Sequence, residues 1–338
     1  MKPISVNVIS ESEFTVQGHG VHTAYLEHVS ALRSSNSFQV YVNSSKKTDI
    51  CHIHTVGPYS LAKLLRNNNT CVTAHVIPDS FIGSFKGAKH WYKISEKYLR
   101  FFYERADHVV AVSQMVADSL KHDIGITKNV SVVPNAINID KIRKAAGNKH
   151  EKRSKLGIDQ SAFVVISVGQ IQPRKRFDVF HKMAKDNPKM QFIWVGGMPF
   201  KKLGANSKEN KQNMTHLPDN LLITGVIPLE QVYQYYSAAD VFVLPSNQEN
   251  HPLAVLEAAA CGLPIILRDI PEYKDAFGGD VIYATDKTFS SKLVELSKST
   301  KLQKEYSQKA KDIAERFGSE HYLNSITKIY TKIIEGEA

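Results

Sequence analysis

Short runs of apolar, often β-branched residues alternate with longer amphipathic stretches along this 338-residue sequence. Runs that are apolar throughout and separated by helical stretches are typical of parallel strands covered on both faces by helices. The sequence therefore predicts an α/β protein with two doubly wound, Rossmann-like parallel sheets. The expected strands cover residues 4–10, 38–42, 50–54, 71–75, 108–112 and 130–133, and then 162–168, 192–196, 221–225, 241–245, 264–267 and 280–283.

The chain length and the distribution of these strands predict two domains. A length of 338 residues suits two domains of about 150 residues each. We expect an N-terminal domain over 1–145 and a C-terminal domain over 146–318, with the polar stretch 140–161 as the linker. The remaining segment, 319–338, contains an amphipathic helix over 319–335 that is expected to pack back on the N-terminal domain. Such sheets bind ligands at the carboxyl ends of their strands, so two facing domains would suit a large, two-part substrate.

The composition is that of a soluble globular protein, with 42% hydrophobic and 22% charged residues. No apolar run approaches the roughly 20 residues of a membrane-spanning helix, and the first residues predict a strand rather than a signal peptide. The widely spaced Cys51, Cys71 and Cys261 form no metal motif and are expected to be reduced thiols. The net charge of +10 fits nucleic acid, an anionic membrane or a phosphorylated ligand, and composition does not choose among them.

The segment 223–269 carries the most specific pattern in the sequence. A strand ends at Ser246, a polar loop contains Glu249, and the helix that follows carries Glu257 within an apolar run. Two glutamates at this spacing also occur on solvated helices, but a carboxylate on an apolar helix face needs a partner. The N-terminus of that helix would offer backbone N–H groups and the positive end of its dipole to a pyrophosphate.

A second candidate follows the expected strand 162–168. Gly169 ends this strand, and the next loop carries Arg174, Lys175 and Arg176. A basic run of this kind, taken alone, equally fits a solvated turn. Beside the first pattern we favour a functional interpretation, because preorganised cations stabilise the charge that builds up on a departing diphosphate.

These two patterns resemble the family-4 glycosyltransferases, which are retaining enzymes of the GT-B fold. That family has a Thr-Gly turn, an aromatic-rich helix, Ala-Asp, a strand ending in Pro-Ser, two glutamates with seven residues between them, and Cys-Gly-x-Pro. The sequence matches this pattern at Thr224-Gly225, Tyr233, Tyr235, Tyr236, Ala239-Asp240, Pro245-Ser246, Glu249, Glu257 and Cys261-Gly262-Leu263-Pro264. The resemblance extends over nearly the whole chain.

The resemblance implies roles in binding a nucleotide-sugar donor. Glu257 would hold the ribose hydroxyls, Glu249 would face the donor hexose as a catalytic residue, and the amides of Leu253 and Ala254 would contact the diphosphate. Lys175 matches a catalytic family lysine.

Other positions depart from the family pattern. Gln170 stands where the family has an arginine, so Arg174 or Arg176 would supply the missing cation. Asn250-His251-Pro252 replaces the usual Gly-Phe-Gly, which affects the expected phosphate contacts and the choice of hexose. The remaining expected donor contacts are Gly169, Gly225 and Asn250.

The first half contributes weaker matches. Gly18 and Gly20 fit a glycine-rich turn that lets the backbone approach the donor. His75 ends an expected strand, where the family has a histidine close to the donor sugar. A lone histidine at a strand end is commonly structural, and only the resemblance favours a catalytic role for it.

No Asp-x-Asp motif occurs in the sequence, so we expect neither a metal nor any other cofactor, with a UDP-sugar as co-substrate. Cations and the helix dipole would then bind the diphosphate. The resemblance also implies retention of anomeric configuration, with the leaving diphosphate helping to deprotonate the acceptor.

Residues 81–105 interleave aromatic and basic side chains, which suits the interface of an anionic bilayer. The alternative is a core helix with a solvated basic face, and nucleic acid is disfavoured because no recognition motif accompanies the patch. The residues expected to contact membrane or acceptor are Phe81, Phe85, Lys86, Lys89, Trp91, Lys93, Lys97 and Arg100.

Segments 12–29, 52–61 and 74–91 resemble the bacterial glycolipid synthases that extend monoglucosyl-diacylglycerol to diglycosyl-diacylglycerol, a lipid that can anchor lipoteichoic acid. The function implied is transfer of a hexose from UDP-glucose or UDP-galactose to that lipid by a peripheral enzyme on the cytoplasmic face of the membrane. The alternatives are a transferase for a soluble or polymeric acceptor such as teichoic acid or polysaccharide, a sugar-nucleotide epimerase, and a non-catalytic membrane-bound sugar-nucleotide sensor.

Overall fold

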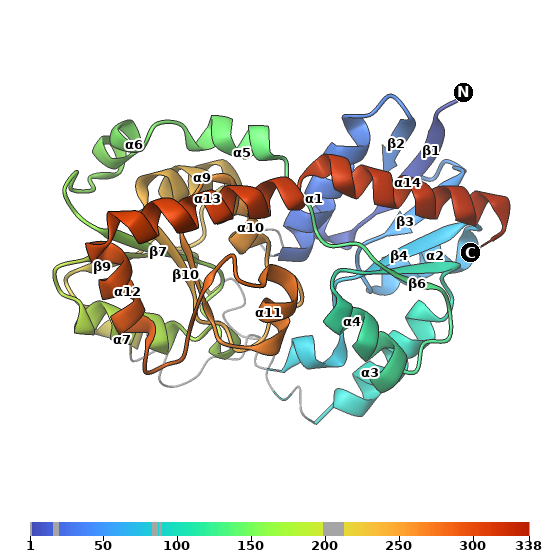
Figure 1. Ribbon diagram of the computed structural model, residues 1–338. Coiled ribbons are helices and arrows are strands. Elements are labelled where there is room, and N and C mark those ends of the chain that lie inside the picture. Colours follow the sequence, from blue (N-terminus) through green and yellow to red (C-terminus); the bar gives the residue numbers. More distant parts are fainter. Residues whose placement is uncertain (1, 16–19, 83–86, 88–89, 199–212, 338) are drawn as a thin grey trace. The chain divides into compact units, whose positions relative to one another are not determined.

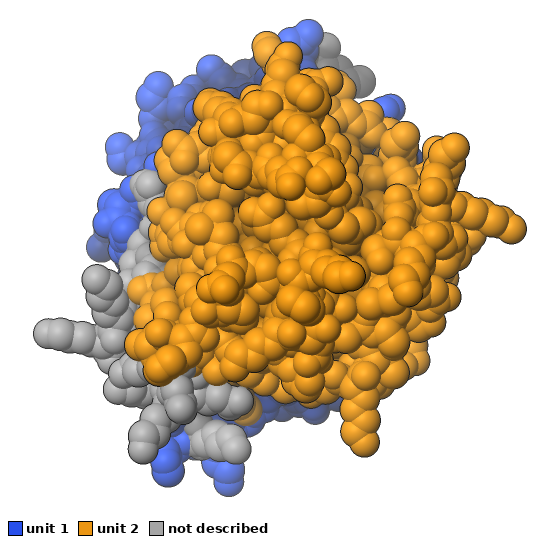
Figure 2. Space-filling model, turned by 90° about the vertical axis from the view of Figure 1, so that its left-hand side faces the viewer, with its two compact units in different colours: residues 1–81, 87–138, 317–338 blue, residues 82–86, 139–316 orange. Residues whose placement is uncertain are grey.

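The computed structural model describes residues 2–15, 20–82, 87, 90–198 and 213–337 (Figure 1). The chain divides into two compact units. Unit 1 comprises residues 1–81, 87–138 and 317–338, and unit 2 comprises residues 82–86 and 139–316; Figure 2 shows them in different colours.

Unit 1 is built on a six-stranded parallel sheet in the order β2-β1-β3-β4-β5-β6. Its strands are β1 (Ile4–Ile9), β2 (Phe38–Val42), β3 (Ile50–Ile53), β4 (Thr70–Ala74), β5 (His108–Ala111) and β6 (Val130–Val132). Its helices are α1 (Gly20–Arg33), α2 (Pro58–Arg66), α3 (Tyr92–Tyr103), α4 (Gln114–Asp118) and α14 (Ser319–Glu335), and short helical turns include η1 (Glu11–Glu13), η2 (Pro78–Phe81) and η3 (Ser119–Asp123).

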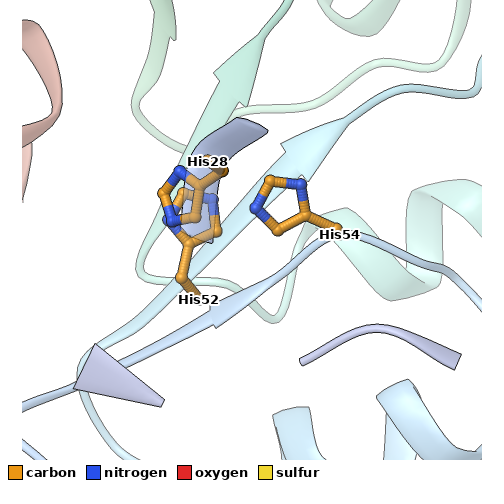
Figure 3. Close-up of side chains that lie close together, drawn as sticks. All are labelled: His28, His52 and His54. Carbon is orange, nitrogen blue, oxygen red and sulfur yellow. The ribbon is translucent and has the colours of Figure 1, made fainter. Parts of the chain in front are cut away.

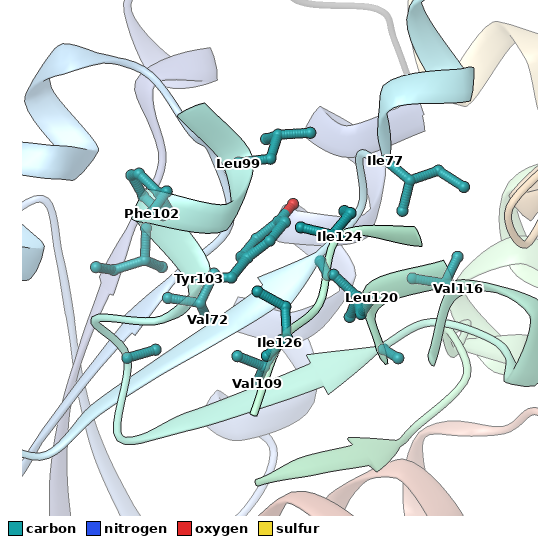
Figure 4. Packing of buried hydrophobic residues seen from close by; sticks show 14 of the residues in the cluster. Val72, Ile77, Leu99, Phe102, Tyr103, Val109, Val116, Leu120, Ile124 and Ile126 are labelled. Atoms are coloured by element: carbon teal, nitrogen blue, oxygen red, sulfur yellow. The ribbon is translucent and has the colours of Figure 1, made fainter. Parts of the chain in front are cut away.

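Two apolar clusters cover the faces of this sheet. One joins α3 and α4 to β3, β4 and β5, with Leu99, Phe102 and Tyr103 fully buried in it (Figure 4). The Tyr103 hydroxyl donates a 2.6 Å hydrogen bond to the carbonyl of Val76. The other cluster joins α1 and α14 to the strands, and α14 contributes Tyr330 to it. The C-terminal helix is therefore part of the core of unit 1.

Unit 2 has a second six-stranded parallel sheet, in the order β12-β11-β10-β7-β8-β9. Its strands are β7 (Val164–Val168), β8 (Gln191–Val195), β9 (Leu221–Ile223), β10 (Val241–Leu244), β11 (Ile265–Arg268) and β12 (Ile282–Ala284). Its helices are α5 (Ile139–Ala146), α6 (Lys149–Leu156), α7 (Phe177–Asp186), α9 (Leu229–Ala238), α10 (Leu253–Ala260), α11 (Pro271–Phe277), α12 (Phe289–Lys298) and α13 (Thr300–Arg316), with the turn η4 (Pro173–Lys175). The strand order reverses between β7 and β10, and ligands of such sheets bind at that point.

The prediction of two doubly wound parallel sheets is confirmed, and the helix expected over 319–335 is α14. The segment expected to be a linker, 140–161, instead forms most of α5 and all of α6, which pack against α9. Asn148 caps α6, and the nearly buried Arg153 donates to the carbonyl of Ala238 and pairs with Asp240 at 2.7 Å. The interpretation as a linker was wrong because the many charges of this stretch lie on the outer face of packed helices.

Candidate functional site

The point of strand-order reversal in unit 2 carries a buried cluster of charges. Arg174 and Lys175 lie in η4, after β7, and Glu249 lies in the loop after β10. Lys175 Nζ lies 2.5 Å from Glu249 Oε1, and Arg174 Nη1 lies 2.9 Å from Glu249 Oε2. The structure thus brings together the three charged residues that the two sequence patterns had singled out separately.

The backbone below this cluster is shaped by two glycines. Gly169 has φ +152°, and its carbonyl accepts a 2.9 Å hydrogen bond from the indole of Trp194. A Cβ atom at Gly196 would lie only 2.1 Å from the Gly169 carbonyl oxygen. These glycines let the ends of β7 and β8 approach closely, which fixes where the loop to Lys175 begins.

The electrostatics of the cluster favour a carboxylate with two cations. Burial raises the pKa of Glu249, but Arg174 and Lys175 outweigh that effect and lower the pKa to about 2. Burial lowers the pKa of Lys175, and Glu249 opposes this change. One carboxylate against two cations leaves one net positive charge, which suits an anionic ligand.

Helix α10 begins beside this cluster. Its first residue, Leu253, follows Pro252, whose side chain provides no capping hydrogen bond, so the N–H groups of the first turn depend on other partners. Leu253 and Ala254 lie in that turn. One turn further along, Glu257 is 5% exposed and its Oε2 lies 3.0 Å from the hydroxyl of Tyr236. A carboxylate on an apolar helix face needs a hydrogen-bond partner, and Tyr236 of α9 is such a partner for Glu257.

Arg176 does not join this cluster. Its φ of +54° turns the chain into α7, and its guanidinium contacts Asp178 at 2.8 Å and Asp286 at 3.0 Å. The nearby Arg268 also pairs with Asp286. Two carboxylates therefore hold Arg176, whereas Glu249 is held by Arg174 and Lys175.

Two other predicted donor contacts, Gly225 and Asn250, also lie in unit 2. Gly225 has φ +71° and forms a bridge with Gly196. The side chain of Asn250 accepts a 2.7 Å hydrogen bond from Gln248. His251, in the segment that departs from the family pattern, is 7% exposed and stacks on Phe277 with ring centroids 6.2 Å apart.

In unit 1, His75 follows β4 directly and is 9% exposed. Its Nε2 lies 3.0 Å from Nδ1 of His54, which follows β3. Both rings line a small cavity of about 10 Å³, roughly the space of one water molecule. Such a cavity is too small for a sugar, so His75 would meet a large ligand only on another side.

Two further histidines extend this pair into a buried cluster, which sequence reasoning missed (Figure 3). His28 comes from α1 and His52 from β3, and both are at most 2% exposed. His52 and His54 share one face of a strand because they are two residues apart, and this His-x-His spacing was the available signal.

Hydroxyl groups hold the two inner rings of the cluster. His28 contacts the hydroxyls of Tyr322 at 2.6 Å and Tyr330 at 3.2 Å. His52 contacts Tyr330 at 2.6 Å and Thr73 at 2.7 Å. All four ring nitrogens of His28 and His52 are thus in hydrogen bonds, so a metal ion would have to displace these partners.

Not every predicted residue can be placed. Gly18, Phe85, Lys86 and Lys89 lie outside the described residues. Gly20 is the first residue of α1. Phe81 packs against Trp91, with ring centroids 5.1 Å apart.

Helix α3 combines the two interpretations of the basic, aromatic segment. One face, with Leu99 and Phe102, is in the core. The other face exposes the predicted cations Lys93, Lys97 and Arg100. Two large apolar side chains are also exposed on this helix, Ile94 at 70% and Phe101 at 41%. A solvated basic face explains the cations but not the exposed apolar residues.

Comparisons with known proteins identify the family. Residues 148–313 match the family "Glycosyl transferases group 1", and residues 16–141 match "Glycosyltransferase Family 4". The chain is 31% identical to the alpha-galactosylglucosyldiacylglycerol synthase of Streptococcus pneumoniae (strain ATCC BAA-255 / R6), over 98% of this chain and 90% of the relative. It is 24% identical to the processive diacylglycerol alpha-glucosyltransferase of Acholeplasma laidlawii, over 80% of this chain and 81% of the relative.

Solved structures share the fold. The sucrose-phosphate synthase of Thermosynechococcus elongatus aligns with a TM-score of 0.81 at 16% identity, covering 98% of this chain and all of that chain. Anabaena Alr3699/HepE, solved with UDP and glucose, aligns with a TM-score of 0.77 at 15% identity, covering 97% of this chain and 99% of that one. The chain belongs to the family-4 glycosyltransferases, has the GT-B fold and is a hexosyltransferase.

Proposed function

We propose that this enzyme transfers a hexose from a UDP-sugar to monoglucosyl-diacylglycerol, with retention of configuration. The use of a UDP-sugar donor is supported mainly by the contact of the buried Glu249 with Arg174 and Lys175, at the point where the strand order reverses. The acceptor half is supported by the relative that matches 98% of this chain, which is named for a galactosylglucosyl-diacylglycerol product. That name favours UDP-galactose over UDP-glucose as the donor.

The proposed donor site uses charge in two ways. The net positive charge beside Glu249 and the N-terminus of α10 would bind the diphosphate of UDP, through Lys175, Arg174 and the amides of Leu253 and Ala254. As the bond between the hexose C1 and the phosphate oxygen breaks, negative charge grows on the diphosphate, and fixed cations stabilise it. The acceptor hydroxyl bonds to C1 and gives its proton to a diphosphate oxygen.

Glu249 has a second role in this proposal. Its low pKa keeps it ionised, so it accepts hydrogen bonds from the hexose hydroxyls and also holds Arg174 and Lys175 in place. Glu257 would accept hydrogen bonds from the ribose while Tyr236 orients its carboxylate. No step of this scheme requires a metal ion.

The transfer reaction is tested directly with both donors. Purified enzyme, vesicles containing monoglucosyl-diacylglycerol, and labelled UDP-galactose or UDP-glucose should give a labelled diglycosyl lipid, with the larger yield from UDP-galactose. Lys175→Met should lower kcat at least 100-fold, because it removes one charge from the leaving-group site, a loss of about 3 kcal/mol. Lys182→Met, at an exposed lysine on α7, is the matched control and should leave kcat unchanged.

Two outcomes would contradict this proposal. Absence of lipid product with either donor, while UDP is released with a soluble or polymeric acceptor, would move the acceptor to another class. Absence of UDP release with every acceptor would favour a non-catalytic sensor. A mass spectrum and anomeric coupling constants of the product decide the retained configuration.

We also propose that the exposed face of α3 lies on the anionic, cytoplasmic surface of the membrane. Lys93, Lys97 and Arg100 would each contribute about 1 kcal/mol near such a surface. Ile94 and Phe101 would enter the interface, as amphipathic helices do. Within the described structure, no helix is both long and apolar enough to cross a bilayer.

Vesicle sedimentation tests this face. Binding should rise with the fraction of phosphatidylglycerol and fall with added salt, because salt screens the cations. The double change Ile94→Ser and Phe101→Ser should weaken binding at least tenfold. Val226→Ser, at a 60% exposed residue of unit 2, is the control. Equal binding by all three proteins would exclude α3 as the membrane contact.

A further inference from the structure

Two loops of unit 2 carry the charges of the proposed donor site. The loop after β7 carries Arg174 and Lys175, and the loop after β10 carries Glu249. Hydrogen bonds join these loops: the N–H of Asn247 donates to the carbonyl of Arg174 at 2.9 Å, and Arg174 Nη1 donates to the carbonyl of Gln248 at 2.6 Å. The position of one loop therefore depends on that of the other.

Lys175 is followed by a residue in an unfavourable backbone conformation. Arg176 has φ +54° and ψ +50°, in the left-handed region. A residue with a side chain rarely adopts this conformation, which persists only where the surrounding structure holds it in place. The guanidinium provides that hold, with contacts to Asp286 at 3.0 Å, Asp178 at 2.8 Å and Asn247 Oδ1 at 3.2 Å. These contacts therefore influence the position of the preceding residue, Lys175.

Asp286 is connected to the second loop as well. Its carboxylate follows β12 and contacts Arg268 of β11 together with Arg176. Arg268 Nε donates a 2.7 Å hydrogen bond to the carbonyl of Pro245, where the loop to Glu249 begins. Asp286 thus contacts one arginine for each of the two loops.

The surroundings of Asp286 keep it ionised. Burial would raise its pKa, but the hydrogen bonds and charges of Arg268 and Arg176 lower the pKa below its ordinary value. The side chain is 44% exposed, and isolated ion pairs at exposed positions add little to stability. Two arginines that share one carboxylate are nevertheless constrained, because neither can move without losing a charge-assisted hydrogen bond. The effect of Asp286 is therefore expected in the relative position of the two loops.

We propose that Asp286 is a positioning residue for the proposed donor site. By holding two arginines at once, it fixes Lys175 against Glu249. The contacts that support this role all lie within unit 2. The consequence for the ligand, tighter binding of the diphosphate of UDP, rests on the proposed function.

A thermodynamic cycle tests the positioning without any ligand. Glu249→Gln removes the charged partner of Lys175, and urea unfolding measures the resulting change in the unfolding equilibrium of unit 2. Trp194 reports on that unit in a Trp91→Phe background. The change caused by Glu249→Gln should be at least about fivefold smaller when Asp286→Asn is also present, because the two sites are coupled. Equal changes in both backgrounds would overturn the proposal.

Binding of UDP is a test in which charge and position have opposite effects. Asp286→Asn removes one negative charge near an anionic ligand, which by itself favours tighter binding. Loss of positioning weakens binding, and we expect the dissociation constant in calorimetry to rise about tenfold, the scale of one charge-assisted hydrogen bond. In a Lys175→Met background the same change should raise it less than about threefold. The proposal is wrong if UDP binding to Asp286→Asn is unchanged or tighter, or if the tenfold effect persists without Lys175.

Asp280 supplies the matched control. It precedes β12, whereas Asp286 follows that strand, and it pairs with Arg316 at 3.1 Å. Asp280→Asn removes the same charge from unit 2 and should leave UDP binding unchanged. Equal weakening in both variants would contradict a positioning role for Asp286. If the unmodified protein binds no UDP, the proposed donor fails, while the unfolding cycle still decides whether Asp286 positions the loops.

Discussion

The carboxylate of Glu249 stabilises unit 2 as well as serving the proposed donor site, and the change Glu249→Gln separates these effects. The variant keeps the size of the side chain but leaves the partly buried Arg174 and Lys175 without their counterion. The pKa of Glu249 is about 2, against an ordinary value of 4.5. At about 1.36 kcal/mol for each pH unit, this difference corresponds to about 3 kcal/mol. Loss of one partner of a buried ion pair is expected to cost about 3–5 kcal/mol.

The sign of the pH dependence follows from the same lowered pKa. Stability from Glu249 is complete above pH 4.5 and is lost as the pH falls towards 2, because the unfolded chain takes up the proton first. The difference in unfolding free energy between the unmodified protein and Glu249→Gln should therefore be about 3 kcal/mol at pH 7 and should shrink below pH 4.5. The exposed Glu230 of α9 supplies a control, and Glu230→Gln should change stability by less than about 0.5 kcal/mol.

Urea unfolding followed by tryptophan fluorescence measures this difference in unit 2 alone. The chain has two tryptophans, and Trp194 is buried in β8 of unit 2. In a Trp91→Phe background, Trp194 reports only the unit that contains Glu249. Saturating UDP should recover part of the loss, because its diphosphate would supply negative charge to Arg174 and Lys175. A difference below about 1 kcal/mol at pH 7, or one that is independent of pH, would refute this reasoning.

Three further changes test other parts of the structure. Tyr330→Phe removes the hydroxyl that contacts His52 and His28, and it should lower the unfolding free energy of unit 1 by about 1–3 kcal/mol. Urea titrations measure this loss, and an unchanged unfolding free energy would contradict these hydrogen bonds. Burial lowers the pKa of His28 to about 3, so unit 1 should lose about 1.4 kcal/mol per pH unit for each such histidine below pH 6.5. The loss should be seen as a smaller hydrogen-exchange free energy in β3, and a constant exchange free energy down to pH 5 would exclude it. Gly196→Ala would place a Cβ atom 2.1 Å from the carbonyl oxygen of Gly169 and should destabilise unit 2 by about 3 kcal/mol. A melting temperature equal to that of the unmodified protein would contradict the close approach of Gly196 to Gly169.

The sequence predicted those features that depend on a local pattern of apolar residues or on the position of a residue at the end of a strand. Apolar runs separated by helical stretches predicted both sheets, because such runs are buried from two sides only in parallel sheets. The meeting of Lys175 with Glu249 was accessible for a related reason: each follows the end of a strand, and those two strands, β7 and β10, are neighbours. Motif positions therefore translated into spatial contacts without knowledge of side-chain geometry.

Contacts between distant segments could not be predicted in this way. Arg176 was grouped with its neighbours in sequence, yet Asp286, 110 residues away, helps to hold it apart from Glu249. The histidine cluster likewise depends on hydroxyls from α14, which lie more than 270 residues from His52 and His28. No local pattern encodes such a pairing, because it arises only when the last helix packs on the first unit.

The position of α14 also sets an order of events during synthesis. Residues 139–316 are continuous in the chain, so unit 2 has all its strands before α14 leaves the ribosome. Unit 1 has its six strands early but lacks Tyr322 and Tyr330 until the residues of unit 2 have been made. At about 5–20 residues per second, the nascent first unit waits about 10–40 seconds between β6 and α14. During that interval His28 of α1 and His52 of β3 lack the tyrosine hydroxyls that they contact in the folded protein.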